Sequence, residues 1–333
     1  MSGFVPSRLS IAKTIIALCG FGLFTQAAVA QDETAKETEQ FIDQMVTKHD
    51  FKRAEVEQLL AQAERNETIL EAIARPWEAK PWHQYYPIFL TEKRLSAGLK
   101  FWQEHADTLA RAEQTYGVPA EIIVAIIGVE TFYGEYRGKY SVLDALYTLG
   151  FHYPPRSKFF RSELEQFMLL TREESLPATE LMGSYAGAMG YGQFISSSYR
   201  HYAVDFDGDE VRDLLGNPVD AIGSVANYFA RHGWKQNAPV ALKLATTDTH
   251  AQLVNKGLKP EATLANLLQD GLELPEGHAL SDDMLGKVFE FEQVENNEYW
   301  LGLHNFYVIT RYNHSPLYAM AVYQFSQQLQ QAR

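Results

Sequence analysis

The stretch that decides the fold is Ile122-Ile-Val-Ala-Ile-Ile-Gly-Val-Glu130-Thr-Phe-Tyr-Gly134, which is apolar almost throughout and contains one carboxyl group. A helix that is apolar on nearly every side is buried, so this segment predicts the central helix of a helical domain. Steps of three and four residues back from Glu130 reach Ile127 and Ile126, so the acid shares a helix face with isoleucines. Two aromatic residues and a glycine follow, which indicates that the helix ends at a cleft.

Glu130 is the main candidate for a catalytic residue. Burial raises the pKa of a carboxylic acid, because the charged form loses more hydration than the neutral form, so this position predicts a proton donor near neutral pH. The alternative is a structural glutamate paired with an arginine. The sequence contains no HExxH, no cysteine pair, no GxSxG motif and no phosphate-binding loop. We therefore expect no cofactor for catalysis.

The composition is that of a globular protein with two or three domains. Of the 333 residues, 46% are hydrophobic and 21% are charged, which excludes a disordered or fibrous chain. The 42 acidic residues outnumber the 29 Lys and Arg residues, and the net charge is −13. Because this charge repels phosphate backbones, nucleic acid is not an expected partner.

Residues 1–30 predict a secretory signal peptide. Two basic residues precede an apolar stretch, 14–24, that is too short to span a bilayer, and Ala28-Val-Ala30 supplies the small residues of a cleavage site. Cleavage after Ala30 predicts a periplasmic protein without cysteine. The alternative is a lipoprotein anchored through Cys19, against which the bulky leucine before that cysteine argues.

Hydrophobic periodicity predicts a mainly α protein with a smaller β part (α+β). Alternation of apolar and other residues at 240–244 and 288–292 predicts strands in a small β-containing region. Apolar residues at three- and four-residue steps, with N-terminal proline and acidic signals, predict helices elsewhere, namely over 37–75, 81–113, 119–130, 161–172 and 315–330.

A glycine-rich segment, Gly187-Ala-Met-Gly190-Tyr-Gly192, lacks the spacing of a dinucleotide-binding loop. Glycines beside Tyr191 and Gln193 indicate either backbone that approaches a ligand closely or tight packing between helices. The sequence leaves both interpretations open.

Four motifs together give the chain a resemblance to a known family. They are Gly128-Val-Glu-Thr-Phe-Tyr-Gly134, Gly183-Ser-Tyr-Ala-Gly-Ala-Met-Gly-Tyr-Gly-Gln-Phe194, Asp220-Ala-Ile-Gly-Ser-Val-Ala-Asn-Tyr-Phe229 and Tyr307-Val-Ile-Thr-Arg-Tyr-Asn-His314. Their residues and order resemble those of membrane-bound lytic murein transglycosylase B and its soluble relatives, over most of the chain after residue 30.

The resemblance implies a goose-lysozyme-like helical core with an additional helical domain and a small β-containing domain. The implied division is a signal peptide at 1–30, an α domain from 31–80 and about 146–183, a catalytic core from 81–145, 184–236 and 303–333, and a β-containing domain at 237–302.

The resemblance also implies an activity, cleavage of the β-1,4 bond between N-acetylmuramic acid and N-acetylglucosamine in peptidoglycan. Glu130 would protonate the glycosidic oxygen and then, as a carboxylate, accept the proton of the muramoyl 6-hydroxyl, which gives a 1,6-anhydro end. One carboxyl group that serves as acid and then as base fits the single acid found above, whereas most glycosidases use two. The alternatives are a muramidase that uses water and a non-catalytic peptidoglycan-binding module. We expect a monomer that acts on glycan strands and meets proteins of cell-wall synthesis.

Several positions match substrate-cleft motifs of the family, and their side chains suit sugars because amides and hydroxyls bind ring substituents while tyrosines stack. For each tyrosine, core packing is the alternative. Arg156 would reach a muramoyl carboxylate or a peptide stem, although Pro155 replaces a second arginine that the family tends to have. The implied substrate-binding residues are Tyr85, Arg156, Ser184, Gln193, Tyr228, Tyr312, Asn313 and Tyr318.

An acidic loop, Asp205-Phe-Asp207-Gly-Asp209-Glu-Val211, has the alternating carboxylates that Ca²⁺ favours, with a main-chain oxygen at Val211. It departs from the EF-hand pattern, because its sixth position is Glu210 and its twelfth is glycine. The family resemblance implies that Asp220 closes a longer loop around a structural Ca²⁺. The alternative is a solvated acidic turn.

Overall fold

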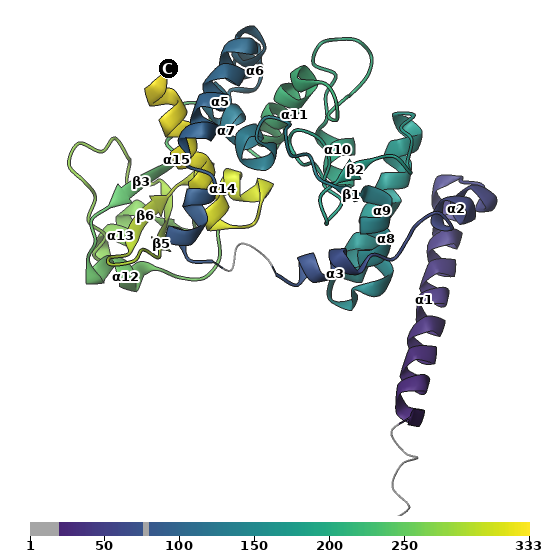
Figure 1. The fold of residues 1–333 in the computed structure, drawn as a ribbon. Coiled ribbons are helices and arrows are strands. Elements are labelled where there is room, and N and C mark those ends of the chain that lie inside the picture. The colour runs from purple at the N-terminus through teal and green to yellow at the C-terminus, as the bar shows by residue number, and fades with distance from the viewer. Residues whose placement is uncertain (1–19, 76–79) are drawn as a thin grey trace, which may run out of the picture. The chain divides into compact units, whose positions relative to one another are not determined.

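A computed structural model describes residues 20–75 and 80–333, which form helices and small antiparallel sheets (Figure 1). This confirms the predicted fold class, mainly α with a smaller β part. The chain divides into a unit that ends at Gln58 and a second unit that extends from Leu59 to Arg333. Most of the predicted signal peptide, residues 1–19, lies outside the described residues. Within the described part, no helix combines the length and hydropathy needed to cross a membrane.

The first unit contains α1 (Gly20–His49) and most of α2 (Arg53–Leu60). Met45 and Val56 are fully buried, as the predicted apolar periodicity requires. Arg53 forms ion pairs with Glu39 (2.7 Å) and Asp43 of α1 and with Glu57 (3.3 Å) of its own helix, so the first two pairs tie α2 to the end of α1. These carboxylates raise the pKa of Arg53.

The second unit contains the remaining helices. In chain order they are α3 (Glu67–Ile73), α4 (Trp82–Tyr85), η2 (Tyr86–Ile88), α5 (Glu92–Glu104), α6 (Ala106–Tyr116), α7 (Ala120–Thr131), α8 (Val142–His152), η3 (Pro154–Arg156), α9 (Ser157–Glu173), α10 (Ser196–Tyr202), α11 (Pro218–Arg231), α12 (Asp248–Leu253), α13 (Leu264–Gln269), α14 (His304–Tyr312) and α15 (Pro316–Ala332).

The centre of this unit is α7, the helix predicted from the apolar stretch. Its residues from Ile122 to Val129 are all buried, and it packs against α5, α6, α11 and α15. Burying each isoleucine contributes roughly 1.5–3 kcal/mol to the free energy of unfolding. Gly128 is required for close packing, because a Cβ there would lie 2.5 Å from Tyr133 Oη and 3.0 Å from Phe325 Cε1.

The helix ends where the sequence predicts. Phe132 and Tyr133 have φ angles of 53° and 60°, and Gly134 has 89°, so three successive residues are in the left-handed region and stop the helix after Thr131. The Thr131 hydroxyl donates to the carbonyl of Tyr191 (2.8 Å) and accepts from the amide of Gly134 (3.0 Å). This hydroxyl therefore ties the end of α7 to the glycine-rich segment.

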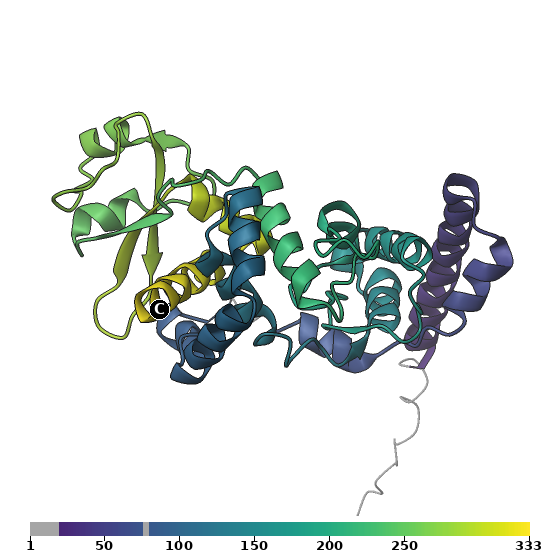
Figure 2. The ribbon, with the colours of Figure 1, turned by 90° about the horizontal axis from the view of Figure 1, so that it is seen from above.

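The strands form two sheets. β1 (Tyr140–Ser141) pairs with β2 (Met182–Gly183), and four strands form a second sheet in the order β3-β6-β5-β4, of which Figure 1 labels β3, β6 and β5; Figure 2 shows the same sheet from above. The strands of the larger sheet are antiparallel, and they are β3 (Ala241–Leu244), β4 (Ala262–Thr263), β5 (Leu285–Phe291) and β6 (Glu298–Gly302).

The larger sheet has its own apolar cluster. Leu244, Val288 and Leu301 are buried together with Leu264 and Leu267 of α13. The predicted strands at 240–244 and 288–292 are thus confirmed at β3, within one residue, and at β5, which begins three residues earlier. The division into domains stays a prediction.

Candidate active site

Glu130 lies in the last turn of α7, half-buried, and lines a cavity of about 370 Å³ that we name the Glu130 cavity. The helix places the carboxyl group there because the eight residues before it are held in the core and the left-handed turn begins two residues after it. The other residues of this cavity are Tyr85, Ile88, Phe89, Val129, Tyr185, Asn313 and Tyr318.

The Glu130 carboxylate accepts a hydrogen bond from the hydroxyl of Tyr318, with Oη 2.6 Å from Oε1. Tyr318 lies in the first turn of α15, which begins at Pro316 and is capped by Ser315, whose hydroxyl accepts from the Tyr318 amide (3.3 Å). Burial and, secondly, the charge of Glu130 raise the pKa of Tyr318 well above its usual value, so the phenol stays a neutral donor. The cavity around Glu130 therefore combines apolar side chains, Ile88, Phe89 and Val129, with a hydroxyl that fixes one carboxyl oxygen.

Tyr85, one of the predicted substrate-binding residues, lines the cavity with Glu130. It is buried at the end of α4, where its ring packs on Phe89 with centroids 5.1 Å apart. Asn313 follows α14 and lines the same cavity. The structure thus brings Tyr85, Asn313 and Tyr318 to one carboxyl group from three separate helices.

A second cavity, of about 470 Å³, is lined by Arg156, Gln193, Tyr228 and Tyr312, and we name it the Arg156 cavity. The ring of Tyr312 stacks on that of Tyr318 at a centroid distance of 6.5 Å and an interplanar angle of 6°. The stacked rings of Tyr312 and Tyr318 therefore lie between the two cavities, one lining each. Seven of the eight predicted substrate-binding residues line one cavity or the other.

Ser184 is the predicted residue that lines neither cavity as the structure gives them. Its hydroxyl accepts from the amides of Ala186 (3.3 Å) and Ala188 (3.1 Å) and thereby holds a turn of the glycine-rich segment. Its neighbour Tyr185 lines the Glu130 cavity instead. Sequence reasoning missed Tyr185 because nothing in a loop pattern tells which of two adjacent side chains faces a cavity.

Tyr228 and Tyr312 use their hydroxyls within the fold. Tyr228 Oη donates to the carbonyl of Arg311 (2.5 Å) and Tyr312 Oη donates to that of Gly192 (2.6 Å). Burial raises the pKa of both phenols. Their rings therefore shape the Arg156 cavity while their hydroxyls hold its walls together.

The glycines of the segment serve packing within the protein. A Cβ at Gly190 would lie 2.2 Å from the carbonyl oxygen of Leu214, and one at Gly192 would lie 2.7 Å from Tyr312 Oη. The sequence allowed either close approach to a ligand or tight packing between helices. At these two positions the structure shows tight packing, but the neighbours are a loop carbonyl and a tyrosine side chain, not a second helix. Gln193, at a φ of 48°, donates from Nε2 to the carbonyls of Gly190 (3.0 Å) and Arg137 (3.3 Å).

The Arg156 cavity is cationic. Arg156 lies over the ring of Phe159 at 4.4 Å, and Arg311 donates from Nη1 to Nε2 of His314 (3.1 Å). Burial, and then the charges of Arg311 and Arg156, lower the pKa of His314, so both guanidinium groups act on one imidazole. No Asp or Glu occurs among the described residues that line this cavity. The sequence did not single out Arg311, although it lies inside the last quoted motif.

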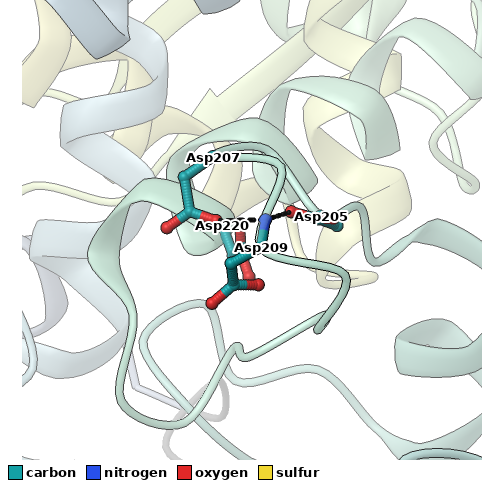
Figure 3. A group of neighbouring side chains, drawn as sticks. All are labelled: Asp205, Asp207, Asp209 and Asp220. Atoms are coloured by element: carbon teal, nitrogen blue, oxygen red, sulfur yellow. Dashed lines mark hydrogen bonds between the residues drawn. The ribbon is translucent and has the colours of Figure 1, made fainter.

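The acidic loop folds as a cluster of four carboxylates, Asp205, Asp207, Asp209 and Asp220, with one oxygen from each within 4.8 Å of the others (Figure 3). Asp220, in the first turn of α11, is fully buried and accepts from the amides of Phe206 (2.7 Å) and Asp213 (2.8 Å). An all-oxygen donor set of this kind fits a hard cation such as Ca²⁺.

At the sixth position of the loop, where the EF-hand pattern has glycine, the backbone is in the left-handed region. Glu210, at the position usually held by glycine, has a φ of 71°. Its amide donates to Asp205 Oδ2 (2.8 Å), and the amide of Val211 donates to Asp209 Oδ1 (2.9 Å). The loop therefore reaches the expected turn with a side chain in place of glycine, at some cost in backbone strain.

Comparison with protein families identifies the chain. The family model for the transglycosylase SLT domain matches residues 33–327. The chain belongs to this family. The predicted resemblance is thereby confirmed, and the Glu130 and Arg156 cavities are features of an SLT transglycosylase domain.

Relatives agree with this assignment. The chain is 44% identical over 305 residues to membrane-bound lytic murein transglycosylase B of Escherichia coli, which covers 89% of this chain and 83% of the relative. It is 48% identical to soluble lytic transglycosylase SltB1 from Pseudomonas aeruginosa, with a TM-score of 0.83 over 89% of this chain and 99% of that one.

Two further solved SLT structures hold bound groups. Escherichia coli Slt35 in complex with calcium is 44% identical, with a TM-score of 0.81 over 89% of this chain and 93% of that one. Pseudomonas aeruginosa SltB3 in complex with NAG-NAM-pentapeptide is 28% identical, with a TM-score of 0.77 over 90% of this chain and 80% of that one.

Proposed function

We propose that the protein is a peptidoglycan lytic transglycosylase that cleaves the β-1,4 bond between N-acetylmuramic acid and N-acetylglucosamine, with Glu130 as its catalytic residue. The observation that carries the proposal is the position of Glu130, half-buried at a cavity in an SLT domain and hydrogen-bonded to a neutral phenol. The SltB3 complex with NAG-NAM-pentapeptide supports a substrate of this class.

In the first step Glu130, protonated, donates its proton to the glycosidic oxygen as the bond to C1 of the muramoyl residue breaks. In the second step the Glu130 carboxylate accepts the proton of the muramoyl 6-hydroxyl, whose oxygen attacks C1. The products are a free N-acetylglucosamine 4-hydroxyl and a 1,6-anhydromuramoyl end, and the carboxyl group regains its proton. Tyr318 fixes Oε1 by its hydrogen bond and so positions the carboxyl group for both transfers.

The two cavities suit the two kinds of group on this substrate. Tyr85, Asn313 and Tyr318 offer a ring face, an amide and a buried ring beside Glu130, which match a sugar ring with an acetamido group. Arg156 and Arg311 make the second cavity a binding site for a carboxylate, such as the lactyl group or the peptide stem. Gln193, Tyr228 and Tyr312 shape that site, and Ser184 contributes by holding the turn beside Tyr185.

Glu130→Gln tests the assignment, because the exchange is nearly isosteric and removes the titrating proton. We expect cleavage of purified sacculi to fall by at least about 10³-fold, as loss of an acid–base group gives. Mass spectrometry of the wild-type digest should show ends one water lighter than hydrolysed ends. A hydrated product would identify a water-using muramidase, and binding without cleavage by the wild type would identify a non-catalytic module.

We also propose that the four-carboxylate cluster binds a structural Ca²⁺. Asp205, Asp207, Asp209 and Asp220 would supply carboxylate oxygens and Val211 its main-chain oxygen. The Slt35 complex with calcium supports this assignment in a related chain. The ion would offset two of the four negative charges of the cluster and connect the loop to the first turn of α11.

The localisation that we propose is the periplasm, with export by a signal peptide cleaved after Ala30. The protein would act there as a monomer on glycan strands, alongside proteins of cell-wall synthesis, and its domains would be those implied by the family. Mass spectrometry of the mature N-terminus tests the export route, since a diacylglyceryl group on Cys19 would replace this proposal with lipid anchoring.

A further inference from the structure

A third cavity, larger than the other two at about 520 Å³, lies where the small β region meets α14. We name it the Lys235 cavity. Its apolar lining includes Met284, Leu303 and Pro260, of which Leu303 and Pro260 are buried. None of its lining residues belongs to the Glu130 or Arg156 cavity.

The rim of this cavity is positively charged in a protein that is otherwise acidic. Lys235 and Lys259 line it from two separate loops, both are exposed, and neither forms an ion pair among the described residues. The one acid of its lining, Asp283, is exposed and hydrogen-bonded to Ser281, which lowers the pKa of Asp283. Against a net charge of −13, two lysines without acidic partners favour an anionic ligand.

A buried lysine holds one of the loops that line this cavity. Lys287 of β5, only 5% exposed, donates from Nζ to the carbonyls of Asn255 (3.0 Å) and Lys256 (3.2 Å), and so anchors the loop that continues to Lys259. Burial lowers the pKa of Lys287 and the charge of Glu261 opposes this shift, so the contribution of Lys287 is the bonds by which it holds the loop. The loop bearing Lys259 is therefore held in place by a cation.

Helix α14 connects this cavity with the active site. His304 and Tyr307 at its start line the Lys235 cavity, whereas Arg311 and Tyr312 at its end line the Arg156 cavity. Eight residues of helix rise about 12 Å. A peptide of five residues reaches at most about 17 Å when extended, so a peptide attached to a muramoyl residue at the active site can reach the Lys235 cavity.

We propose that the Lys235 cavity binds the far end of the acidic peptide stem, beyond the part next to the sugar that the Arg156 cavity holds, with the carboxylates of that end on Lys235 and Lys259 and its small apolar side chains on Met284 and Leu303. This inference rests on the proposed function, because it needs a glycan strand at Glu130. The site makes the enzyme prefer strands that carry peptides.

The test compares Lys235→Glu/Lys259→Glu with the control Lys48→Glu/Lys52→Glu, which changes the charge equally at two exposed lysines of the first unit. Each variant is assayed on peptide-bearing glycan strands and on strands from which an amidase has removed the peptides. We expect the first variant to lose about five- to tenfold in kcat/KM on peptide-bearing strands alone, as two exposed ion pairs would give. The control should lose nothing on either substrate.

Three results would overturn the proposal: an unchanged preference, an equal loss on both substrates, or an equal loss in the control. Lys235→Gln/Lys259→Gln, with its melting temperature, replaces the first variant if that one does not fold. Binding is measured separately on the wild type by the NMR shift of the Met284 methyl group on titration with free L-Ala-γ-D-Glu-diaminopimelyl-D-Ala-D-Ala. A shift without any glycan cleavage would uphold this site while the proposed function fails, and no shift would refute the site.

Discussion

At the scale of single residues, the hydrogen bond from Tyr318 to Glu130 leads to the first prediction. Tyr318→Phe removes the donor and keeps the ring that stacks on Tyr312. A hydrogen bond to a charged group contributes about 1.5–3 kcal/mol, so we expect kcat on sacculi to fall by about 10- to 100-fold. The melting temperature should change little, because the exchange preserves the buried ring.

Tyr323→Phe is the matched control. Tyr323 lies on the same helix, α15, and its hydroxyl donates to the carbonyl of Ala241 (3.1 Å), away from Glu130. Its exchange should leave kcat within about twofold and cost about 1 kcal/mol of stability at most. Full activity in Tyr318→Phe would show that Glu130 needs no positioning by this phenol.

The residues of the site could be predicted to different extents, and the reason is physical. Glu130 was recognisable because it is the one acid in the apolar stretch 122–134 and directly precedes the predicted end of the helix, and the structure places it at a cavity. The structural role of Ser184 could not be predicted, because its hydroxyl accepts hydrogen bonds from amides of its own turn and the sequence does not show this local turn. Tyr185 and Arg311 were missed, since one sequence does not show which way a loop or a helix end turns a side chain.

At the scale of elements, the packing of α7 leads to a second prediction. Gly128→Ala puts a methyl group 2.5 Å from Tyr133 Oη, a buried hydroxyl wedged between Gly98 and Gly128. Overpacking costs about 1–3 kcal/mol, while alanine gains up to about 1 kcal/mol of helix propensity, so we expect a net loss of about 1–2 kcal/mol in urea denaturation. Activity should fall as well, because Tyr133 belongs to the turn that follows Glu130.

Gly150→Ala is the control for helix propensity. A Cβ at Gly150 in α8 would lie 3.2 Å from Arg161 Cγ, the nearest atom, which belongs to a flexible side chain. We expect its stability to stay within about 1 kcal/mol of the wild type. If Gly128→Ala were as stable as this control, the close packing beneath Glu130 would not be needed.

A third prediction concerns two acids on α9 whose pKa values shift in opposite directions. Burial raises the pKa of Glu163, which accepts a hydrogen bond from the amide of Ser197 (3.0 Å) in the first turn of α10. The hydrogen bond from Arg200 lowers the pKa of Glu173. A raised carboxyl pKa gives stability that is present at acid pH and is lost as pH rises; a lowered one gives stability that is lost as pH falls.

Glu163→Gln keeps an acceptor and removes the titration, so its stability relative to the wild type should rise between pH 4 and pH 7. Glu173→Gln should show the reverse, becoming relatively less stable over the same range. Urea denaturation at both pH values measures each difference. Parallel trends in the two variants would contradict the opposite environments that the structure gives these acids.

Periodicity predicted α7, α9 and α15 to within a few residues, but it did not predict α8, α11 or α14, and it gave α1 to α3 as one continuous stretch. The strands β3 and β5 were visible as alternation, whereas the two-residue strands β1, β2 and β4 are too short to produce a period. The end of α7 was predictable, because aromatic residues and a glycine follow the last apolar turn. That Thr131 would tie this end to Tyr191, sixty positions later, was not predictable from either segment alone.

At the scale of the whole molecule, charge is distributed unevenly. The chain carries a net charge of −13, yet the Arg156 and Lys235 cavities present cations and the four-carboxylate cluster concentrates acids in one loop. An anionic polymer is therefore drawn to particular sites and repelled elsewhere. Asp220 of the cluster lies at the start of α11, the helix that also carries Tyr228, which lines the Arg156 cavity. A cation bound by the cluster would therefore stabilise this helix as well as the loop.

Removal of Ca²⁺ gives the last prediction. An ion present at about 100 times its dissociation constant adds about 2.7 kcal/mol to the free energy of unfolding, which corresponds to a rise of about 5 °C in melting temperature for a protein of this size. We expect millimolar Ca²⁺ to produce this rise and a chelator to reverse it. Asp207→Asn/Asp209→Asn should abolish the response, while Glu210→Gln, which removes an acid of the same loop outside the cluster, should retain it. A wild-type melting temperature that does not move with Ca²⁺ would mean that the four carboxylates hold no ion, and the buried Asp220 would then serve only to bind the amides of Phe206 and Asp213.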